Sequence, residues 1–278
     1  MSKKRRRRRK KYRIANMKLF LSAVVAGIVV IVLIIAAAVN IAGWLAGDEE
    51  KPEEHGVKET VAETTKATQP AEYVPQVKIE PSGEYVSINR LMIVNKHNKL
   101  DSGYVPDDLI LPDSRTGTNE SRQYMTREAA DAMNALTSDA ADAGSTIKVV
   151  SGYRDYDYQE GLFRRYANQE GTAKAETYSA RAGYSEHQTG LCADVSSPSV
   201  GYKLSYSYDE TKEGKWLAEN CWKYGFIIRY PEGKTEITGY VYEPWHIRYV
   251  GQENAEKIKN SGLTLEEYTG NEAAPDYE

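Results

Sequence analysis

The sequence predicts an α+β fold, in which a small, mostly antiparallel sheet has helices packed on one face, preceded by one transmembrane helix and a disordered stalk. Three observations lead to this prediction. Short apolar runs of strand length are mixed with longer amphipathic segments, without the regular alternation that characterises parallel α/β folds. Residues 19–47 contain no charged side chain, and residues 48–80 contain few large apolar ones.

The charge of the chain is distributed very unevenly. The 278 residues are 41% apolar and 27% charged, enough for one substantial globular domain plus additional segments, and the formal net charge is −4. Residues 1–18 hold eleven Lys or Arg and no acid, which leaves 25 of the 36 bases against all 40 acids in the remainder. A remainder this acidic is a poor partner for nucleic acid.

The N-terminus combines a basic run with an apolar run. Alone, Lys3–Lys11 would be typical of a nuclear address or a nucleic-acid patch. The adjacent residues 19–47 are long enough for a helix that crosses the ~30 Å hydrocarbon core. Because positive charge stays cytoplasmic, we expect residues 1–18 inside and everything after the helix outside the cell membrane. A cleaved signal peptide is the alternative, but its apolar core spans only ~7–15 residues.

Residues 48–84 are expected to form a disordered extracellular stalk. They are rich in Glu, Lys, Thr, Ala and Pro, and such a segment cannot bury enough apolar surface to offset its ordering entropy. The folded domain is predicted over residues 85–270, with a disordered tail at 271–278.

The first half of the domain begins with a short apolar strand at 91–95. Thr126 is the expected N-cap of a helix that ends near Ala143, since apolar residues recur at spacings of four, three and four. A strand at 147–150 follows, and then a helix at 156–169 that Gly171 stops.

The second half contains mainly short elements. A buried strand is predicted at 191–195, followed by a Ser/Tyr-rich loop, 196–211, that is long enough to wall a cleft. Further elements are expected as a helix at 216–224, strands at 226–230, 238–242 and 245–250, a helix at 252–260 and a packed segment at 263–268.

Two segments carry residues suited to bind a metal. Asp194 lies within an apolar run, where a carboxylate is costly unless it is paired or bound to a cation. His187, seven residues earlier, and His246 would complete a set of two imidazoles and one carboxylate. Three such ligands leave a fourth position open, and Glu243 is close enough in sequence to serve as the base of a catalytic zinc site with one Zn²⁺ ion.

The alternative is that both histidines are hydrogen-bonded core residues and Asp194 a turn carboxylate. Two of the four histidines, His55 and His97, lie in the predicted stalk and near the domain edge. The other two, His187 and His246, both lie near acidic residues in apolar surroundings, which favours the metal site. Residues three apart on a strand point to opposite faces. Because Pro244 cannot donate to a ladder, we expect a chain break at Glu243–Pro244 that turns both Glu243 and His246 towards one site.

Three blocks of the sequence resemble the VanY-type D-alanyl-D-alanine carboxypeptidases of the M15 zinc metallopeptidases. These blocks are Ser151–Arg154, Ser185–Gly190 with Asp194, and Glu243–His246, within a similarity from about Leu91 to Tyr268. The resemblance implies a zinc enzyme that removes the C-terminal D-Ala from peptidoglycan stem peptides, and the apolar N-terminal helix predicted above would anchor it in the membrane. L,D-carboxypeptidase or endopeptidase activity is the alternative, and a non-catalytic wall-binding module is a third.

The resemblance also suggests roles for further residues. Arg154 is expected to stabilise the charge that develops on the scissile oxygen, as a fixed guanidinium can. Ser185, Gln159 and Tyr230 are implied to bind the terminal D-Ala and its carboxylate.

The two cysteines leave several interpretations open. Cys192 and Cys221 are compatible with one disulfide in an oxidising exterior. Cys192 is two residues from Asp194, so a soft metal ligand is conceivable, but we interpret it as a small buried hydrophobe.

Overall fold

The computed structural model describes residues 73, 75–117 and 120–278 of the chain. The predicted cytoplasmic segment 1–18, the membrane helix 19–47 and most of the predicted stalk lie outside these residues. Within the described residues, no helix combines the length and the apolar character that crossing a bilayer requires.

A four-stranded antiparallel sheet forms the centre of the domain, in the order β3-β4-β6-β5. Its strands are β3 (Lys148–Ser151), β4 (Cys192–Ser196), β6 (His246–Tyr249) and β5 (Phe226–Ile228). A separate two-stranded sheet pairs β1 (Leu109–Ile110) with β2 (Met125–Thr126). In the central pair, Asp194 lies opposite His246 and Cys192 opposite Arg248. The predicted α+β class with small antiparallel sheets is confirmed.

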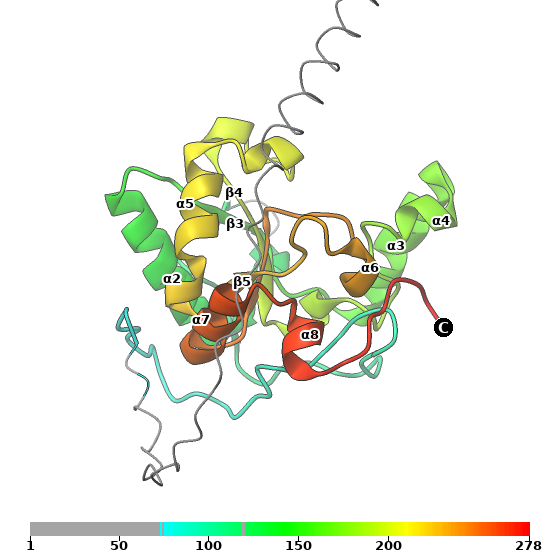
Figure 1. The fold of residues 1–278 in the computed structure, drawn as a ribbon, viewed down its shortest axis with the longest axis horizontal. Coiled ribbons are helices and arrows are strands. Elements are labelled where there is room, and N and C mark those ends of the chain that lie inside the picture. The colour runs from blue at the N-terminus through cyan, green and yellow to red at the C-terminus, as the bar shows by residue number, and fades with distance from the viewer. Residues whose placement is uncertain (1–72, 74, 118–119) are drawn as a thin grey trace, which may run out of the picture. The chain divides into compact units, whose positions relative to one another are not determined.

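One face of the central sheet is the main hydrophobic core. Alternate residues of β4, Ala193 and Val195, are fully buried there with side chains of α2 (Arg127–Asp142) and α5 (Lys212–Asn220). Figure 1 shows these two helices next to each other on one side of the strands. The predicted helix at 127–143 is therefore present, although the Thr126 side chain makes no capping hydrogen bond.

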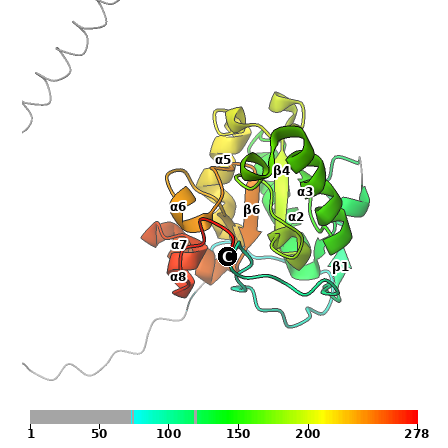
Figure 2. The ribbon, with the colours of Figure 1, turned by 90° about the vertical axis from the view of Figure 1, so that its right-hand side faces the viewer.

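The opposite face carries the polar side chains and has its own helices. Helices α3 (Tyr156–Glu170) and α4 (Thr172–Ala175) lie on the other side of the strands from α2 and α5 in Figure 1, and in Figure 2 α3 lies in front of the sheet. The expectation that helices pack on one face only is thus wrong. Asp155 caps α3 by accepting a 2.7 Å hydrogen bond from the Tyr158 amide.

Most of the other helices in the described residues are short. They are η1 (Glu120–Arg122), η2 (Glu186–Thr189), η3 (Pro198–Val200), η4 (Tyr206–Tyr208), η5 (Cys221–Tyr224), α6 (Thr235–Thr238) and α8 (Leu265–Thr269), whereas α7 (Gln252–Ser261) is at least as long as α5. The predicted helix at 252–260 corresponds to α7, and the one at 216–224 to α5 together with η5.

Two predicted strands are not present. At 91–95 the carbonyls of Arg90 and Met92 accept hydrogen bonds from the buried Arg248 side chain instead of joining a ladder. At 238–242 helix α6 ends and a loop follows, in which Gly239 has a φ of 79°.

Both ends of the described domain differ from the expected boundaries. Val77 and Ile79 pack against the main core, and the Val77 carbonyl accepts a hydrogen bond from Gln252, so folded structure begins before residue 85. At the other end Ala274 is fully buried and the Pro275 carbonyl accepts a hydrogen bond from Lys96. The tail 271–278, expected to be disordered, therefore packs on the domain.

Candidate metal centre

The register of β4 and β6 brings the first two predicted ligands together. Asp194 and His246 are cross-strand partners, and Asp194 Oδ1 lies 3.0 Å from His246 Nδ1. His187 comes from η2, just before β4, and its Nε2 lies 3.4 Å from Asp194 Oδ2. The two imidazole ring centroids are 5.0 Å apart. Three side chains that are distant in sequence thus converge, and each is at most 4% exposed.

A backbone contact fixes the orientation of His187. Its Nδ1 lies 2.6 Å from the Gly152 carbonyl, which only accepts, so Nδ1 carries the hydrogen and Nε2 is left as the lone-pair nitrogen. A side chain at Gly152 would collide with the Tyr124 carbonyl, so glycine is required for this close approach. This explains why the Ser151–Arg154 block matters although none of its side chains is a predicted ligand.

Glu243 reaches the same place through a turn. The His246 amide donates a 3.2 Å hydrogen bond to the Glu243 carbonyl, and β6 begins only at His246, so the predicted break at Glu243–Pro244 is present. The turn places Glu243 Oε2 3.8 Å from His246 Nδ1. Burial raises the pKa of Glu243 to about 7, with His246 opposing this increase and Asp194 adding to it.

In Asp194 and His246, neighbouring groups of opposite charge outweigh the effect of burial on the pKa. Burial alone would raise the pKa of Asp194, but the adjacent His187 and His246 hold it well below its usual range. Burial disfavours protonated His246, yet Cys192, Asp194 and Glu186 hold the pKa of this imidazole well above its usual value. The site therefore pairs the Asp194 carboxylate with protonated imidazoles, and a cation bound there would take the place of those protons.

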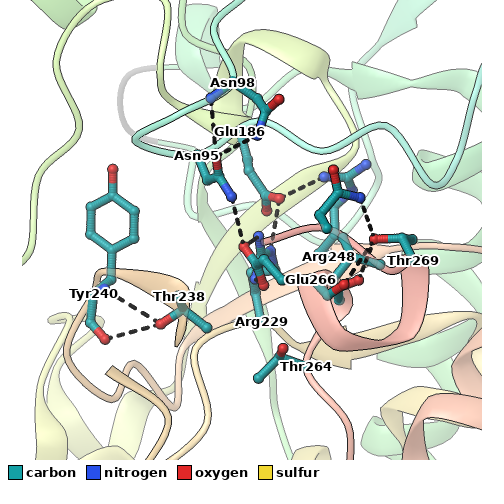
Figure 3. A network of polar contacts seen from close by, with 12 residues as sticks. Asn95, Asn98, Glu186, Arg229, Thr238, Tyr240, Arg248, Thr264, Glu266 and Thr269 are labelled. Atoms are coloured by element: carbon teal, nitrogen blue, oxygen red, sulfur yellow. Dashed lines mark hydrogen bonds and ion pairs between the residues drawn. The ribbon is translucent and has the colours of Figure 1, made fainter. Parts of the chain in front are cut away.

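A buried ion network lies beside the centre and includes Glu186 of η2 and Arg248 of β6. Glu186 Oε1 accepts hydrogen bonds from Arg229 Nε at 2.8 Å and from Arg248 Nη1 at 2.7 Å (Figure 3). Arg229 also donates two hydrogen bonds, of 2.8 and 2.6 Å, to Glu266. All four side chains have no exposed surface, so two positive and two negative charges balance in the interior.

The residues fit a divalent metal ion. His246 Nε2 and Glu186 Oε2 are buried without a hydrogen-bond partner and lie 3.7 Å apart, too far for one to satisfy the other. Among the described residues, two sets offer three ligand atoms within 4.8 Å of one another: Asp194–Glu243–His246 and His187–Cys192–His246. Imidazole with carboxylate or thiolate is the donor set of zinc.

His187, Asp194, Glu243 and His246 line a cleft of about 340 Å³. Arg154, Ser185 and Tyr230 line it, and the Arg154 Nε is buried without a hydrogen-bond partner. Gln159 does not line this cleft; its amide donates a 2.7 Å hydrogen bond to the Ala180 carbonyl and so shapes the wall from behind.

The predicted loop 196–211 does wall the cleft. It contributes Leu204 and Tyr206, and the Tyr206 ring lies 5.4 Å from that of Trp245. Tyr206 is 57% exposed, so an aromatic side chain is available at the mouth.

Comparison with known proteins assigns the family. The family described as "VanY: D-alanyl-D-alanine carboxypeptidase" matches residues 122–252, which include every residue of the centre. YodJ of Bacillus subtilis strain 168 is 46% identical over 182 residues, covering 65% of this chain and 67% of YodJ. The chain belongs to the VanY family.

Solved structures of VanY relatives agree with this assignment. The LdcB LD-carboxypeptidase shares 45% identity with a TM-score of 0.63, covering 66% of this chain and 86% of LdcB. A mutant of the vancomycin resistance D,D-pentapeptidase VanY, in complex with Zn(II), shares 34% identity with a TM-score of 0.56, covering 65% of this chain and 98% of that one.

Several residues of this VanY domain were not found from the sequence. Glu186, Arg229 and Arg248 were not singled out, because their pairing depends on segments that are 43 and 62 residues apart. The sequence did offer one signal for Glu186, because this glutamate directly precedes the predicted metal ligand His187. The two cysteines are both free and buried, so the disulfide left open by the sequence is not formed.

Proposed function

We propose that this VanY-family protein is a zinc carboxypeptidase that removes the C-terminal D-alanine from peptidoglycan stem peptides. The observation that carries the proposal is the buried Glu243 carboxylate, 3.8 Å from His246 in a centre that also holds His187 and Asp194. A base beside a metal-type donor set is the arrangement of hydrolytic zinc enzymes.

His187, Asp194 and His246 would hold the ion. A zinc ion supplies Lewis-acid activation of water and of the scissile carbonyl. Glu243 accepts the proton of the attacking water and donates it to the leaving D-alanine amine, a role that suits a carboxyl group whose pKa is about 7.

Arg154 supplies the fixed positive charge of the cleft. Its side chain lines the cleft beside His187 and Glu243, and its unpartnered Nε is ready to donate to an anionic group. In the proposed reaction it stabilises the negative charge that develops on the scissile oxygen. Ser185 and Tyr230 bind the terminal D-alanine and its carboxylate, whereas Gln159 acts by holding the Ala180 segment in place.

The assay uses defined stem peptides and mass spectrometry. We expect the purified zinc-loaded protein to remove one alanine from a pentapeptide that ends in D-Ala-D-Ala, and the Glu243→Gln variant to leave it intact. A wild-type protein that retains zinc and cleaves neither a pentapeptide nor a tetrapeptide would refute the proposal.

L,D-carboxypeptidase activity is the second candidate, and the similarity to LdcB favours it. In that case the bond cleaved follows an L-amino acid, and the tetrapeptide rather than the pentapeptide loses its D-alanine. Supplying both peptides to the same preparation separates the two activities by which mass decreases.

We also propose that the chain is a single-pass membrane protein with its catalytic domain outside the cell. The uncharged residues 19–47 and the eleven basic residues before them support this orientation. Protease added to intact protoplasts should remove the catalytic domain, and protection of the domain until lysis would contradict this orientation.

A further inference from the structure

Cys192 belongs to the same face of β4 as the ligand Asp194. Successive strand side chains alternate between faces, so residues 192 and 194 point the same way, towards the centre. Cys192 is fully buried and forms no disulfide. Its Sγ and one nitrogen each of His187 and His246 lie within 4.8 Å of one another. Tetrahedral coordination at Zn–S and Zn–N bond lengths places such atoms roughly 3.5 Å apart, so modest side-chain movement closes the set.

A second observation at the same place points to a cation. His246 is 4% exposed, and because its Nδ1 faces Asp194 and Glu243, the nitrogen without a partner is Nε2 on the other side of the ring. The unpartnered Glu186 Oε2 lies 3.7 Å from this nitrogen. A buried imidazole nitrogen and a buried carboxylate oxygen, both without a hydrogen-bond partner, thus lie next to each other on a histidine that also belongs to the set with Cys192.

We propose that Cys192 is a metal ligand and that His187, Cys192 and His246 form a second, sulfur-containing set for thiophilic divalent ions such as Cd²⁺. Thiolate is a soft ligand and favours soft ions, whereas the carboxylate of Asp194 favours harder ones. On binding, the thiol loses its proton to solvent and a metal–sulfur bond forms, without any change of oxidation state. This inference rests on the proposed metal centre.

The position of the set predicts its effect on the enzyme. The sulfur-containing set shares His187 and His246 with the proposed zinc ligands, but it contains Cys192 and neither Asp194 nor the proposed base Glu243. Residues 192 and 194 are separated by roughly 6.6 Å along the strand. An ion drawn towards Cys192 therefore moves away from the base Glu243, so thiophilic ions should inhibit hydrolysis by displacing zinc.

The experiment loads the metal-free protein with Co²⁺ or Cd²⁺ and records its near-ultraviolet absorption. With one equivalent of ion, we expect a thiolate-to-metal charge-transfer band in the wild type, loss of the band in Cys192→Ala and Cys192→Ser, and its full retention in Cys221→Ser. Cys221 is the matched control, because it is the only other cysteine and also lies buried. Chelator competition should show at least a tenfold loss of Cd²⁺ affinity in Cys192→Ala and less than a twofold change in Cys221→Ser.

The Cys221→Ser variant tests the proposal even if the Cys192 variants do not fold. In Cys221→Ser, Cys192 is the only thiol of the chain, so absence of the band with one ion bound overturns the proposal. Equal Cd²⁺ affinity of wild type and Cys192→Ala overturns it as well. The proposed function fails separately: a protein that shows the band but hydrolyses no stem peptide loses the proposed activity and keeps Cys192 as a ligand.

Discussion

Replacing Glu186 with glutamine tests the buried ion network. Glu186 binds Arg229 and Arg248 at 2.8 and 2.7 Å, and neither arginine has exposed surface. Glutamine has nearly the same shape, so no cavity forms. The substitution removes one negative charge from a balanced group of four and leaves a net positive charge in the interior.

The expected loss of stability is large for one conservative substitution. Breaking a buried ion pair by removing one partner costs about 3–5 kcal/mol, because the remaining charge stays buried without compensation. Glutamine retains one oxygen acceptor, which favours the lower end of this range. For a domain of 150–250 residues, about 3 kcal/mol corresponds to a decrease in Tm of roughly 6–12 °C.

Thermal unfolding of the metal-free protein measures this effect, with Glu253→Gln as the control. Glu253 also pairs with a cation, Lys257 at 2.6 Å, but both side chains are more than half exposed, so its loss should change the free energy of unfolding by less than about 1 kcal/mol. If Glu186→Gln unfolds within about 1 kcal/mol of the wild type, the network does not stabilise the domain as inferred.

The pH dependence gives a second check on the same substitution. Burial alone would raise the pKa of Glu186, but Arg229 and Arg248 hold it below its usual range. A carboxyl group with a depressed folded-state pKa stabilises the protein above its unfolded pKa of about 4.3, and this contribution is lost as the pH falls through the folded-state pKa. The difference between wild type and Glu186→Gln should be constant from neutral pH to about 5 and shrink below about 4.

Three further predictions concern the centre. Glu243→Gln should keep its zinc but lower kcat by roughly 10²–10⁴-fold, measured by peptide hydrolysis and metal analysis; a rate above a tenth of wild type would exclude Glu243 as the base. Arg154→Ala should lower kcat by roughly 10²–10³-fold, and an unchanged kcat would remove Arg154 from charge stabilisation. Because protons compete for His187 and His246, whose pKa values are raised, zinc affinity measured by chelator competition should fall with decreasing pH, and chelation should abolish activity that added zinc restores. Affinity that does not vary between pH 8 and 5.5 would contradict this assignment.

Patterns within one segment predicted much of this fold. The helix at α2 was found because Ala129, Met133, Leu136 and Ala140 repeat at helical spacing, and all four are fully buried. The break at Glu243–Pro244 followed from the period of a strand and the missing amide of proline, and the chain does turn there.

What the sequence did not predict depends on partners from distant segments. Residues 91–95 have the composition of a strand. However, Arg248 donates hydrogen bonds to the carbonyls of Met92 and Arg90, which lie 156 and 158 residues earlier in the chain. The tail 271–278 looks like a polar end, yet Lys96 and Tyr240 contact it from two other parts of the chain. Local propensity carries no information on such contacts, so tertiary structure overrides it.

Strand β4 connects the hydrophobic core with the metal centre, because its side chains point alternately to one and to the other. Ala193 and Val195 face the core under α2, while Cys192 and Asp194 face the centre. A shift of one residue in pairing with β6 would bury the carboxylate in the apolar core and expose the apolar side chains to the cleft. The cost of burying Asp194 without a partner therefore fixes the register, and the same register sets His246 opposite it. The folding energy that selects this pairing thus also brings the proposed metal ligands together, so a substitution such as Ala193→Asp should disrupt the core and the centre together.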